Sequence, residues 1–533
     1  MNKSFISHLT HPEKTYEKLL YLVFSGVLTG CCITFPTLSG EIVSWFSLVP
    51  ALCVLFESQK SREKYRRVWE CGFLFFMSEY IVIYHWFLSM YPLEFTGLSK
   101  GAALCVVLLG WLGLSALASA AGGLFCLALV FVCRHIKTDS DIPAILLAPA
   151  FYSCFEWFET LGWMGVPWNR LGLSQLGADI SPTLMSSAFF GSYFTTFIML
   201  LFASLIAAGL RNGKERCIAA LLLAAANLLY GFSAIALNNA DASETVRVAA
   251  IQGNISSAEK WDTDKRTFTL EKYKSLTEEA ANEGAEIILW PETAITYVIK
   301  DGSDCDIQLR ALAAECGCLL CVGCFEEENG SNKNVIRFYL PDGSVYPESY
   351  SKRHLVPFGE YVPWKNFFMT VVPPLAKLTM IDKGLAAGSD SSLAEYAGIN
   401  IGCLICFDSI YETLCAESCR DGADMMLLST NDSWFGTSAA LNMHNNQARL
   451  RAIENNICIL RAANTGISSA IDGNGTVICR TEAATDGYII ADIQIGGGSF
   501  YSSTGNIFVF ICLTSVILSI IYAAFDVIKK KRG

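Results

Sequence analysis

Long apolar stretches fill most of the first 240 residues and return near the C-terminal end of the chain. A helix needs about 20 mostly apolar residues to cross the hydrocarbon core of a bilayer. Eight stretches reach or approach that length, and we predict that each forms a membrane-spanning helix. They are residues 19–35, 41–56, 71–88, 101–133, 142–158, 183–210, 217–237 and 507–527. The fourth is long enough to hide two helices, and the fifth is short and contains Pro149.

Basic residues mark one side of these predicted spans. They precede the first span and follow the second, fourth, sixth and eighth, whereas the short loops on the other side carry only Lys100 and Arg170. Because basic loops stay in the cytoplasm, both termini are predicted to be cytoplasmic and the segment between the last two spans periplasmic. We expect the first stretch to remain as an anchor, because no small-residue cleavage site follows it.

From Val246 the pattern changes to short apolar runs that alternate with amphipathic segments. Short apolar runs bounded by turn residues predict strands, and a 3.6-residue period predicts helices. Expected strands cover 246–255, 285–290, 319–325, 335–340, 345–350, 401–406, 425–430, 457–462 and 488–493. Expected helices cover 264–282, 308–316 and 439–455, and turns at 341–343 and 472–475 predict hairpins. This alternation indicates an α/β domain.

Composition agrees with this division. The mean hydropathy is +0.38, and 52% of residues are hydrophobic while 17% are charged, which is typical of a membrane protein. A net charge of −11 argues against a nucleic-acid-binding protein, which needs a basic face. The chain has 21 Cys, and the run from Cys316 to Cys324 has no second pair at zinc-finger spacing. We interpret that run as a buried strand and expect neither a metal nor a cofactor.

Cys406 lies where an apolar run over 400–405 gives way to an amphipathic segment. That pattern predicts a strand, a tight turn and a helix, with the thiol at the turn. Nearby backbone N–H groups and a helix N-terminus would favour its thiolate. However, Cys is also among the most buried residue types, so this position alone does not identify a nucleophile.

Two further candidates follow apolar strands. Glu292 comes directly after residues 287–291, and Lys352 comes after the predicted strand 345–350. Since neighbouring strand–helix units bring strand ends to one edge of a sheet, we expect Glu292, Lys352 and Cys406 to meet there. Acyl transfer through a thioester needs a thiol nucleophile, a carboxylate to move its proton and a cation for the oxyanion. Taken singly, a glutamate and a lysine at such positions are more often surface residues.

Together the motifs around these residues resemble those of the nitrilase (carbon–nitrogen hydrolase) superfamily. They are Trp290-Pro291-Glu292, the run Lys352-Arg-His-Leu-Val-Pro-Phe-Gly-Glu360, and Ile405-Cys406-Phe407-Asp408. With flanking membrane spans, nearly the whole chain resembles the apolipoprotein N-acyltransferase family. Further matches are 246–253 with Lys260-Trp261-Asp262, 431–436, His444, 451–454, 461–466, 165–168 and 174–175.

The resemblance implies a multi-pass α-helical membrane domain of about eight helices and an exported nitrilase-like domain with an α-β-β-α sandwich. We expect the membrane domain over 1–240, with seven helices, and the catalytic domain over 245–496 on the periplasmic side. A C-terminal membrane helix with a basic cytoplasmic tail is expected over 505–533.

The resemblance also implies roles for single residues. Glu292 would be the general base, Lys352 the oxyanion stabiliser and Cys406 the nucleophile, with Glu360 as a supporting second carboxylate. Further substrate-binding or supporting residues would be Trp261, Phe407, Asp408, Trp434, His444 and Trp168. The chain departs from the family in having Phe407-Asp408 in place of the usual Tyr-Glu, and Met443 before His444 in place of Gln.

The implied reaction moves an acyl chain from a phospholipid, most simply phosphatidylethanolamine, to a diacylated apolipoprotein at the bacterial inner membrane. It would need no cofactor or metal and no nucleic acid. One alternative is a membrane-tethered amidase with the same three residues, and another is a transporter or scaffold whose outer domain only binds. The apolar segment 364–385 is either a buried loop or a lid that admits an acyl chain.

Overall fold

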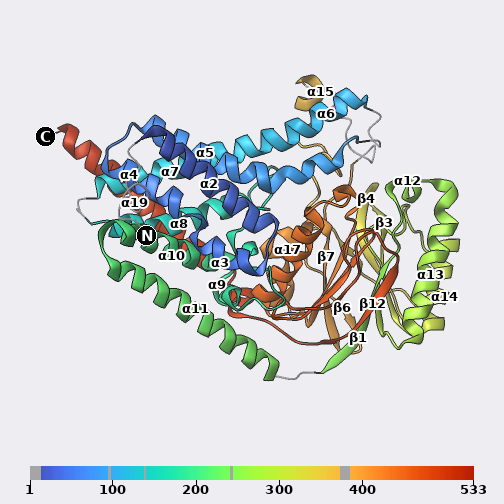
Figure 1. The fold of residues 1–533 in the computed structure, drawn as a ribbon. Helices are drawn as coiled ribbons and strands as arrows, with labels where there is room; N and C mark the ends of the chain where they lie inside the picture. The colour runs from blue at the N-terminus through green and yellow to red at the C-terminus, as the bar shows by residue number, and fades with distance from the viewer. Residues whose placement is uncertain (1–13, 94–97, 137–139, 241–243, 372–383, 533) are drawn as a thin grey trace. The chain divides into compact units, whose positions relative to one another are not determined.

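The computed structural model describes residues 14–93, 98–136, 140–240, 244–371 and 384–532 (Figure 1). These residues form two compact units, which are described separately. The first takes in the chain up to residue 88, then 104–236 and 506 onward, and the second takes in 89–103 and 237–505.

The first unit is helical. Its helices are α2 (Thr15–Thr34), α3 (Leu38–Ser47), α4 (Val49–Lys60), α5 (Tyr65–Ile83), α6 (Lys100–Leu108), α7 (Leu114–His135), α8 (Ile142–Phe158), α9 (Ser187–Phe190), α10 (Ser192–Asn212), α11 (Lys214–Ala240) and α19 (Ile507–Arg532). In the described residues, seven helical stretches are long and apolar enough to cross a membrane, and α8 is a shorter apolar helix. Each of the eight predicted spans therefore corresponds to a helical stretch.

Two spans differ from the prediction in detail. The fourth does not hide two helices, because α6 and α7 join through a π-helical turn (Leu109–Gly113) into one stretch over Lys100–His135. The sixth starts later than residue 183, because Gly191 has φ +79° and separates the short α9 from α10. A left-handed glycine ends one helix and allows the next to begin, and hydropathy does not detect it.

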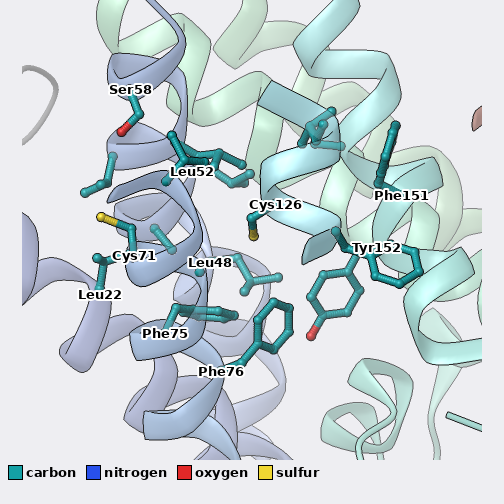
Figure 2. A pocket seen from close by; sticks show the side chains of 18 of the residues that line it. Leu22, Leu48, Leu52, Ser58, Cys71, Phe75, Phe76, Cys126, Phe151 and Tyr152 are labelled. Carbon is teal, nitrogen blue, oxygen red and sulfur yellow. The ribbon is translucent and has the colours of Figure 1, made fainter. Parts of the chain in front are cut away.

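Helices α2, α4, α5, α7 and α8 surround an apolar cavity of about 70 Å³, to which α10 contributes Leu200 (Figure 2). Phe75, Phe76 and Cys126 line it together with aliphatic side chains, and Tyr152 lies at the same cavity. The interior of this unit is therefore built from aromatic and aliphatic packing.

The second unit contains two six-stranded sheets. The first has the order β12-β1-β2-β3-β4-β5 and the second β11-β10-β9-β8-β7-β6. The first sheet consists of β1 (Thr245–Gln252), β2 (Ile287–Leu289), β3 (Leu319–Glu328), β4 (Ser331–Tyr339), β5 (Tyr350–Ser351) and β12 (Gly487–Gln494). The second consists of β6 (Ala394–Tyr396), β7 (Ile399–Ile405), β8 (Met425–Thr430), β9 (Ile459–Ala463), β10 (Ser469–Ile471) and β11 (Val477–Arg480).

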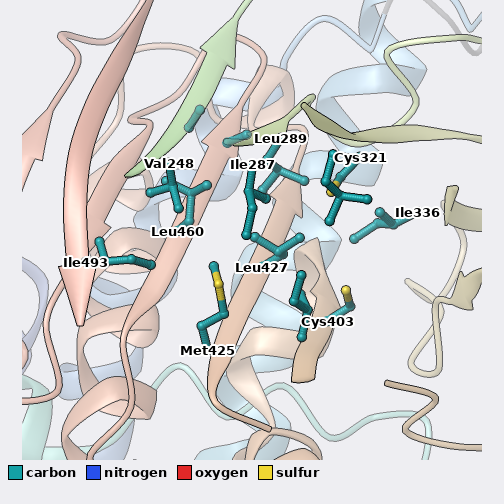
Figure 3. Close-up of a cluster of buried hydrophobic side chains, with 14 of the residues drawn as sticks. Val248, Ile287, Leu289, Cys321, Ile336, Cys403, Met425, Leu427, Leu460 and Ile493 are labelled. Atoms are coloured by element: carbon teal, nitrogen blue, oxygen red, sulfur yellow. The ribbon is translucent and has the colours of Figure 1, made fainter. Parts of the chain in front are cut away.

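The two sheets pack face to face. Val248 and Ile287 of the first sheet share one buried cluster with Cys403, Leu427 and Leu460 of the second (Figure 3). Alternate residues of the first sheet point the other way and share a second cluster with the helices α13 (Arg266–Asn282) and α14 (Asp304–Cys316). Helices α16 (Glu412–Arg420) and α17 (Ala440–Asn455) contact the second sheet. Burial on both faces explains the nearly continuous apolar runs of these strands.

Most predicted elements of this unit are present, and the differences have local causes. Helix α14 begins at Asp304 rather than residue 308, because the Ser303 side chain accepts from the backbone N–H of Asp306 and caps it. Strands β3 and β4 run on to form a hairpin at Asn329-Gly330 that the sequence interpretation missed. The predicted strand over 345–350 is reduced to β5.

The predicted lid falls partly outside the described residues. Helix α15 (Lys365–Val371) covers its first part, with Trp364 and Phe367 exposed, whereas residues 372–383 are not described. The lid hypothesis therefore stays a prediction.

Candidate active site

The three candidate catalytic residues come from both sheets of the sandwich. Glu292 follows β2 and Lys352 follows β5 in the first sheet, whereas Cys406 follows β7 in the second. The prediction that all three lie along one edge of a single sheet was therefore wrong. They meet instead because strand ends of two facing sheets converge.

A buried cation and two carboxylates form the centre of this site. The Lys352 ammonium donates to Glu292 Oε1 at 2.9 Å and to the Glu360 carboxylate at 2.9 Å. Burial alone would lower the pKa of Lys352, but the charges of Glu292 and Glu360 outweigh it and raise that pKa well above its usual value. Lys352 is therefore a fixed positive charge.

Glu292 is held by more than this ion pair. Asn334 Nδ2 donates to its Oε1 at 2.7 Å, and the backbone N–H of Asn431 donates to its Oε2 at 3.0 Å. Burial would raise the pKa of Glu292, but the charges of Lys352 and Lys260 and the hydrogen bond from Asn334 hold it below its usual value. By contrast, burial raises the pKa of Glu360 despite Lys352, and the charge of Glu292 adds to that rise. Glu292 is thus a carboxylate that stays ionised and can accept a proton.

Asn334 was missed by the sequence interpretation. It lies on β4 and also contacts Glu360 Oε1 at 3.3 Å, so it joins both carboxylates. The only local signal is a polar residue at the start of the buried part of the strand, and β4 carries other polar residues as well. A buried amide needs partners, which points to nearby polar groups.

Cys406 begins a short 3-10 turn (Cys406–Ile410) directly after β7. Its φ is +50°, a left-handed backbone conformation that is uncommon for residues other than Gly. Burial and the charge of Glu292 raise the pKa of the Cys406 thiol, and Lys352 only partly opposes them. The prediction that this turn favours the thiolate was therefore wrong for the resting site, because burial outweighs the local dipoles. The thiol needs a base.

Asp408 is buried and organises the backbone around the site. Its carboxylate accepts from the backbone N–H groups of His354 at 2.7 Å and Ile405 at 3.1 Å, and from the Tyr350 hydroxyl at 3.0 Å. Since His354 lies in the loop of Lys352 and Ile405 precedes Cys406, this carboxylate ties the two catalytic segments together. Of the two roles expected for Asp408, substrate-binding or supporting, these hydrogen bonds favour the supporting one.

His444 is also buried beneath the turn. Its Nδ1 lies 2.8 Å from Asp432 Oδ1, and its Nε2 lies 3.0 Å from the Ser409 hydroxyl and 3.3 Å from the Cys406 carbonyl. Arg461 donates to the other Asp432 oxygen at 2.7 Å. This network supports the backbone of the nucleophile from the side of α17.

The aromatic candidates are spread over several places. Trp261 is 39% exposed and its ring lies 6.3 Å from that of Phe325. Phe407 is half-buried and meets Tyr411 edge to face, and Trp434 is half-buried in a 3-10 turn (Ser433–Phe435). Trp168 belongs to the first unit, where it is buried 5.1 Å from the ring of Trp86. Trp168 is therefore packed in the interior of its own unit, and its expected contact with substrate stays a prediction.

Gly323 on β3 allows the Glu292 loop to approach the sheet. A Cβ on Gly323 would lie 2.1 Å from the Pro291 carbonyl oxygen and 2.9 Å from Glu292 Cα. We expect Gly323→Ala to displace Glu292 and to lower unfolding stability by about 1–3 kcal/mol. Thermal unfolding and the rate at which iodoacetamide alkylates Cys406 would check this. Gly101→Ala, where an added Cβ meets open space, is the control, and an unchanged alkylation rate in Gly323→Ala would contradict the expectation.

Comparison with known proteins agrees with these observations. Residues 247–499 match the carbon-nitrogen hydrolase family, and residues 25–205 match the apolipoprotein N-acyltransferase N-terminal domain. A curated apolipoprotein N-acyltransferase of Geobacter metallireducens is 27% identical over 94% of each chain. One of Allorhizobium ampelinum is 30% identical over 76% of this chain and 77% of its own length. One of Gloeobacter violaceus is 28% identical over 87% of this chain and 85% of its own.

The second unit thus has the nitrilase-like α/β fold with two sheets, and the apolar helices together with these relatives make this a bacterial membrane protein. The two matching segments occur in the right order, and the relatives align over most of the chain. The chain belongs to the apolipoprotein N-acyltransferase family.

Proposed function

We propose that this protein transfers an acyl chain from a phospholipid to the N-terminus of a lipoprotein. The acceptor is the α-amino group of a diacylglyceryl-Cys, and the acyl chain passes through a thioester on Cys406. The observation that carries the proposal is the buried cluster of Lys352, Glu292 and Glu360 next to a thiol. The printed names of the relatives support the same activity.

In the first half-reaction Glu292 takes the proton of the Cys406 thiol as the sulfur attacks the ester carbonyl of the phospholipid. The negative charge then lies on the carbonyl oxygen of the tetrahedral intermediate. As the intermediate collapses, Glu292 returns the proton to the departing glycerol oxygen. The products are a thioester on Cys406 and a lysophospholipid.

In the second half-reaction the α-amino group of the lipoprotein attacks the thioester carbonyl. Glu292 accepts a proton from the amine and passes it to the departing Cys406 sulfur. An amide bond forms, and the thiol is regenerated. Each half-reaction therefore uses the same carboxylate first as base and then as acid, as general acid–base catalysis allows.

Lys352 is the group that would stabilise the oxyanion in both steps. An ammonium carries three N–H groups, and Glu292 and Glu360 account for two of them. A fixed cation beside the place where negative charge develops contributes most in a buried site, because little solvent screens it. Glu360 pairs with the ammonium and keeps it in place.

The distribution of basic residues supports a topology with both termini in the cytoplasm and the catalytic domain on the periplasmic side of the inner membrane. In that topology, the phospholipid donor and the exported lipoprotein reach the site from the same side. Phosphatidylethanolamine is the donor we propose. No metal, cofactor or nucleic acid takes part in the proposed reaction.

The experiment uses the purified full-length protein in nanodiscs that contain phosphatidylethanolamine with a deuterated acyl chain. A synthetic diacylglyceryl-Cys lipopeptide is added, and its mass is followed. We expect a gain of one deuterated acyl group on the lipopeptide, and none with an N-acetylated lipopeptide. Release of ammonia from a small amide without acylation of the lipopeptide would instead support a membrane-tethered amidase. Lipid or lipopeptide binding with no turnover of either would support a protein that only binds.

A further inference from the structure

Lys260 is a second lysine at this site, and the reaction described above does not use it. It is the last residue of the short helix α12 (Ser257–Lys260), and its side chain turns inward, since only 4% of Lys260 is exposed. The next residue, Trp261, is 39% exposed. A lysine is rarely buried without a partner, because removing its charge from water costs several kcal/mol.

The partner of Lys260 is the backbone of the proposed base. Its Nζ donates to the carbonyl oxygen of Glu292 at 2.8 Å. The next residue, Thr293, has φ +48°, which is an outlier for a β-branched residue. A charge-assisted hydrogen bond to the Glu292 carbonyl therefore helps to hold the peptide that joins Glu292 to this strained residue.

Lys260 also balances the charge of the site. Glu292 and Glu360 together outweigh Lys352 by one negative charge, and Lys260 restores neutrality. The Lys260 ammonium lies within electrostatic range of both the Glu292 carboxylate and the Cys406 thiol. When the proton moves from Cys406 to Glu292, the negative charge moves from the Glu292 carboxylate to the Cys406 sulfur. Lys260 interacts with both positions.

We propose that Lys260 is a positioning residue of the active site, which holds the Glu292 backbone and supplies a second positive charge that favours the Cys406 thiolate. This inference rests on the proposed role of Cys406 as nucleophile. The two lysines contact different parts of Glu292. Lys352 pairs with its carboxylate, and Lys260 donates to its backbone carbonyl.

The charge of Lys260 depends on pH in an accessible range. Burial lowers its pKa to about 8, although Glu292 and Cys406 oppose the shift. The cation is therefore present below about pH 8 and is lost as the pH rises through that value. The other ionisable groups that face the thiol are Glu292, Lys352 and Asp432. Lys352 has a raised pKa, and Asp432 a lowered one because its pairing with Arg461 and His444 outweighs burial, so neither changes charge near pH 8.

The test measures alkylation of Cys406 by iodoacetamide against pH, read from the mass of the peptide that contains Cys406. It needs no lipid substrate. We expect Lys260→Met to move the alkylation profile to higher pH by about one unit, because a positive charge close to an acidic group lowers its pKa by about one to three. The deficit relative to wild type should shrink above pH 8, where the wild type loses the same charge. Lys260→Arg should restore the low-pH rate and remove the change near pH 8.

Lys265→Met is the matched control, because Lys265 is exposed and its loss changes the net charge equally. An unshifted profile in Lys260→Met, or an Arg variant no closer to wild type than the Met variant, would overturn the proposal. Equal thermal unfolding of the variants shows that a shift is not caused by misfolding. A shifted profile in a protein that never forms an acyl-enzyme would leave Lys260 as a modulator of the thiol and contradict the proposed acyl transfer instead.

Discussion

Glu292→Gln is expected to form its acyl-enzyme about 10³ times more slowly than the wild type, within the range that general bases contribute. Gln keeps the size of Glu, and its single amide oxygen can still accept from Lys352, whereas its NH2 group faces the backbone N–H of Asn431. The amide of Gln cannot take the proton of the Cys406 thiol. Because burial raises the pKa of that thiol, almost no thiolate is present at neutral pH without a base. The time course of the protein mass after mixing with phosphatidylethanolamine measures this rate.

Glu278→Gln is the matched control, because Glu278 lies exposed on α13 and its replacement removes one carboxylate far from any partner described here for the site. Its acylation rate should equal that of the wild type. If Glu292→Gln formed the acyl-enzyme within about threefold of wild type, which is less than 1 kcal/mol of the activation barrier, another group would be the base.

Lys352→Met is expected to lower the free energy of unfolding by about 3–5 kcal/mol, as for other buried ion pairs that lose one partner. The variant leaves Glu292 and Glu360 buried with no cation between them. It should also fail to form the acyl-enzyme, since the oxyanion loses its stabilising charge. Thermal unfolding in detergent, followed by intrinsic fluorescence, reports the first effect, and protein mass reports the second.

A second substitution separates the two effects. In Lys352→Met with Glu360→Gln, a neutral amide replaces one of the two carboxylates. Part of the lost free energy of unfolding should therefore return, while acylation stays absent. Lys333→Met serves as control, because Lys333 pairs with Glu328 in a partly exposed ion pair, which contributes at most about 1 kcal/mol. Recovery of acylation in the double variant would show that Lys352 acts only by balancing charge.

The membrane helices and the buried strands could be predicted from the sequence because each depends on a local pattern. Strand β8 was predicted with both of its ends, since all six of its residues are buried and polar residues flank it. Helix boundaries that depend on one backbone angle, as at Gly191, or on one capping side chain, as at Ser303, lie outside what hydropathy detects.

The sequence predicted which residues form the centre of the site, but not which strands and sheets bring them together. Glu292, Lys352 and Glu360 were expected together and do contact one another. However, strand patterns do not show that the chain leaves the first sheet for the second between β5 and β6, so the site was assigned to one sheet edge. Asn334 and Lys260 matter through contacts with residues far along the chain, and no local pattern encodes them.

The motifs left open whether Asp408 and His444 bind substrate or support the site. Their hydrogen bonds go to the backbone and to neighbouring side chains beneath Cys406. A motif records which residues occur together, whereas their roles depend on which way each side chain points.

We propose above all that Cys406 carries the acyl chain from a phospholipid to a lipoprotein. The most direct test is the intact mass of the full-length protein after incubation with phosphatidylethanolamine, for the wild type and for Cys406→Ala. The account predicts one acyl adduct on the wild type that hydroxylamine removes and that a diacylated lipopeptide discharges, and no adduct on Cys406→Ala. A wild-type protein that acylates the lipopeptide without ever carrying the adduct, or an equal adduct on Cys406→Ala, would contradict it.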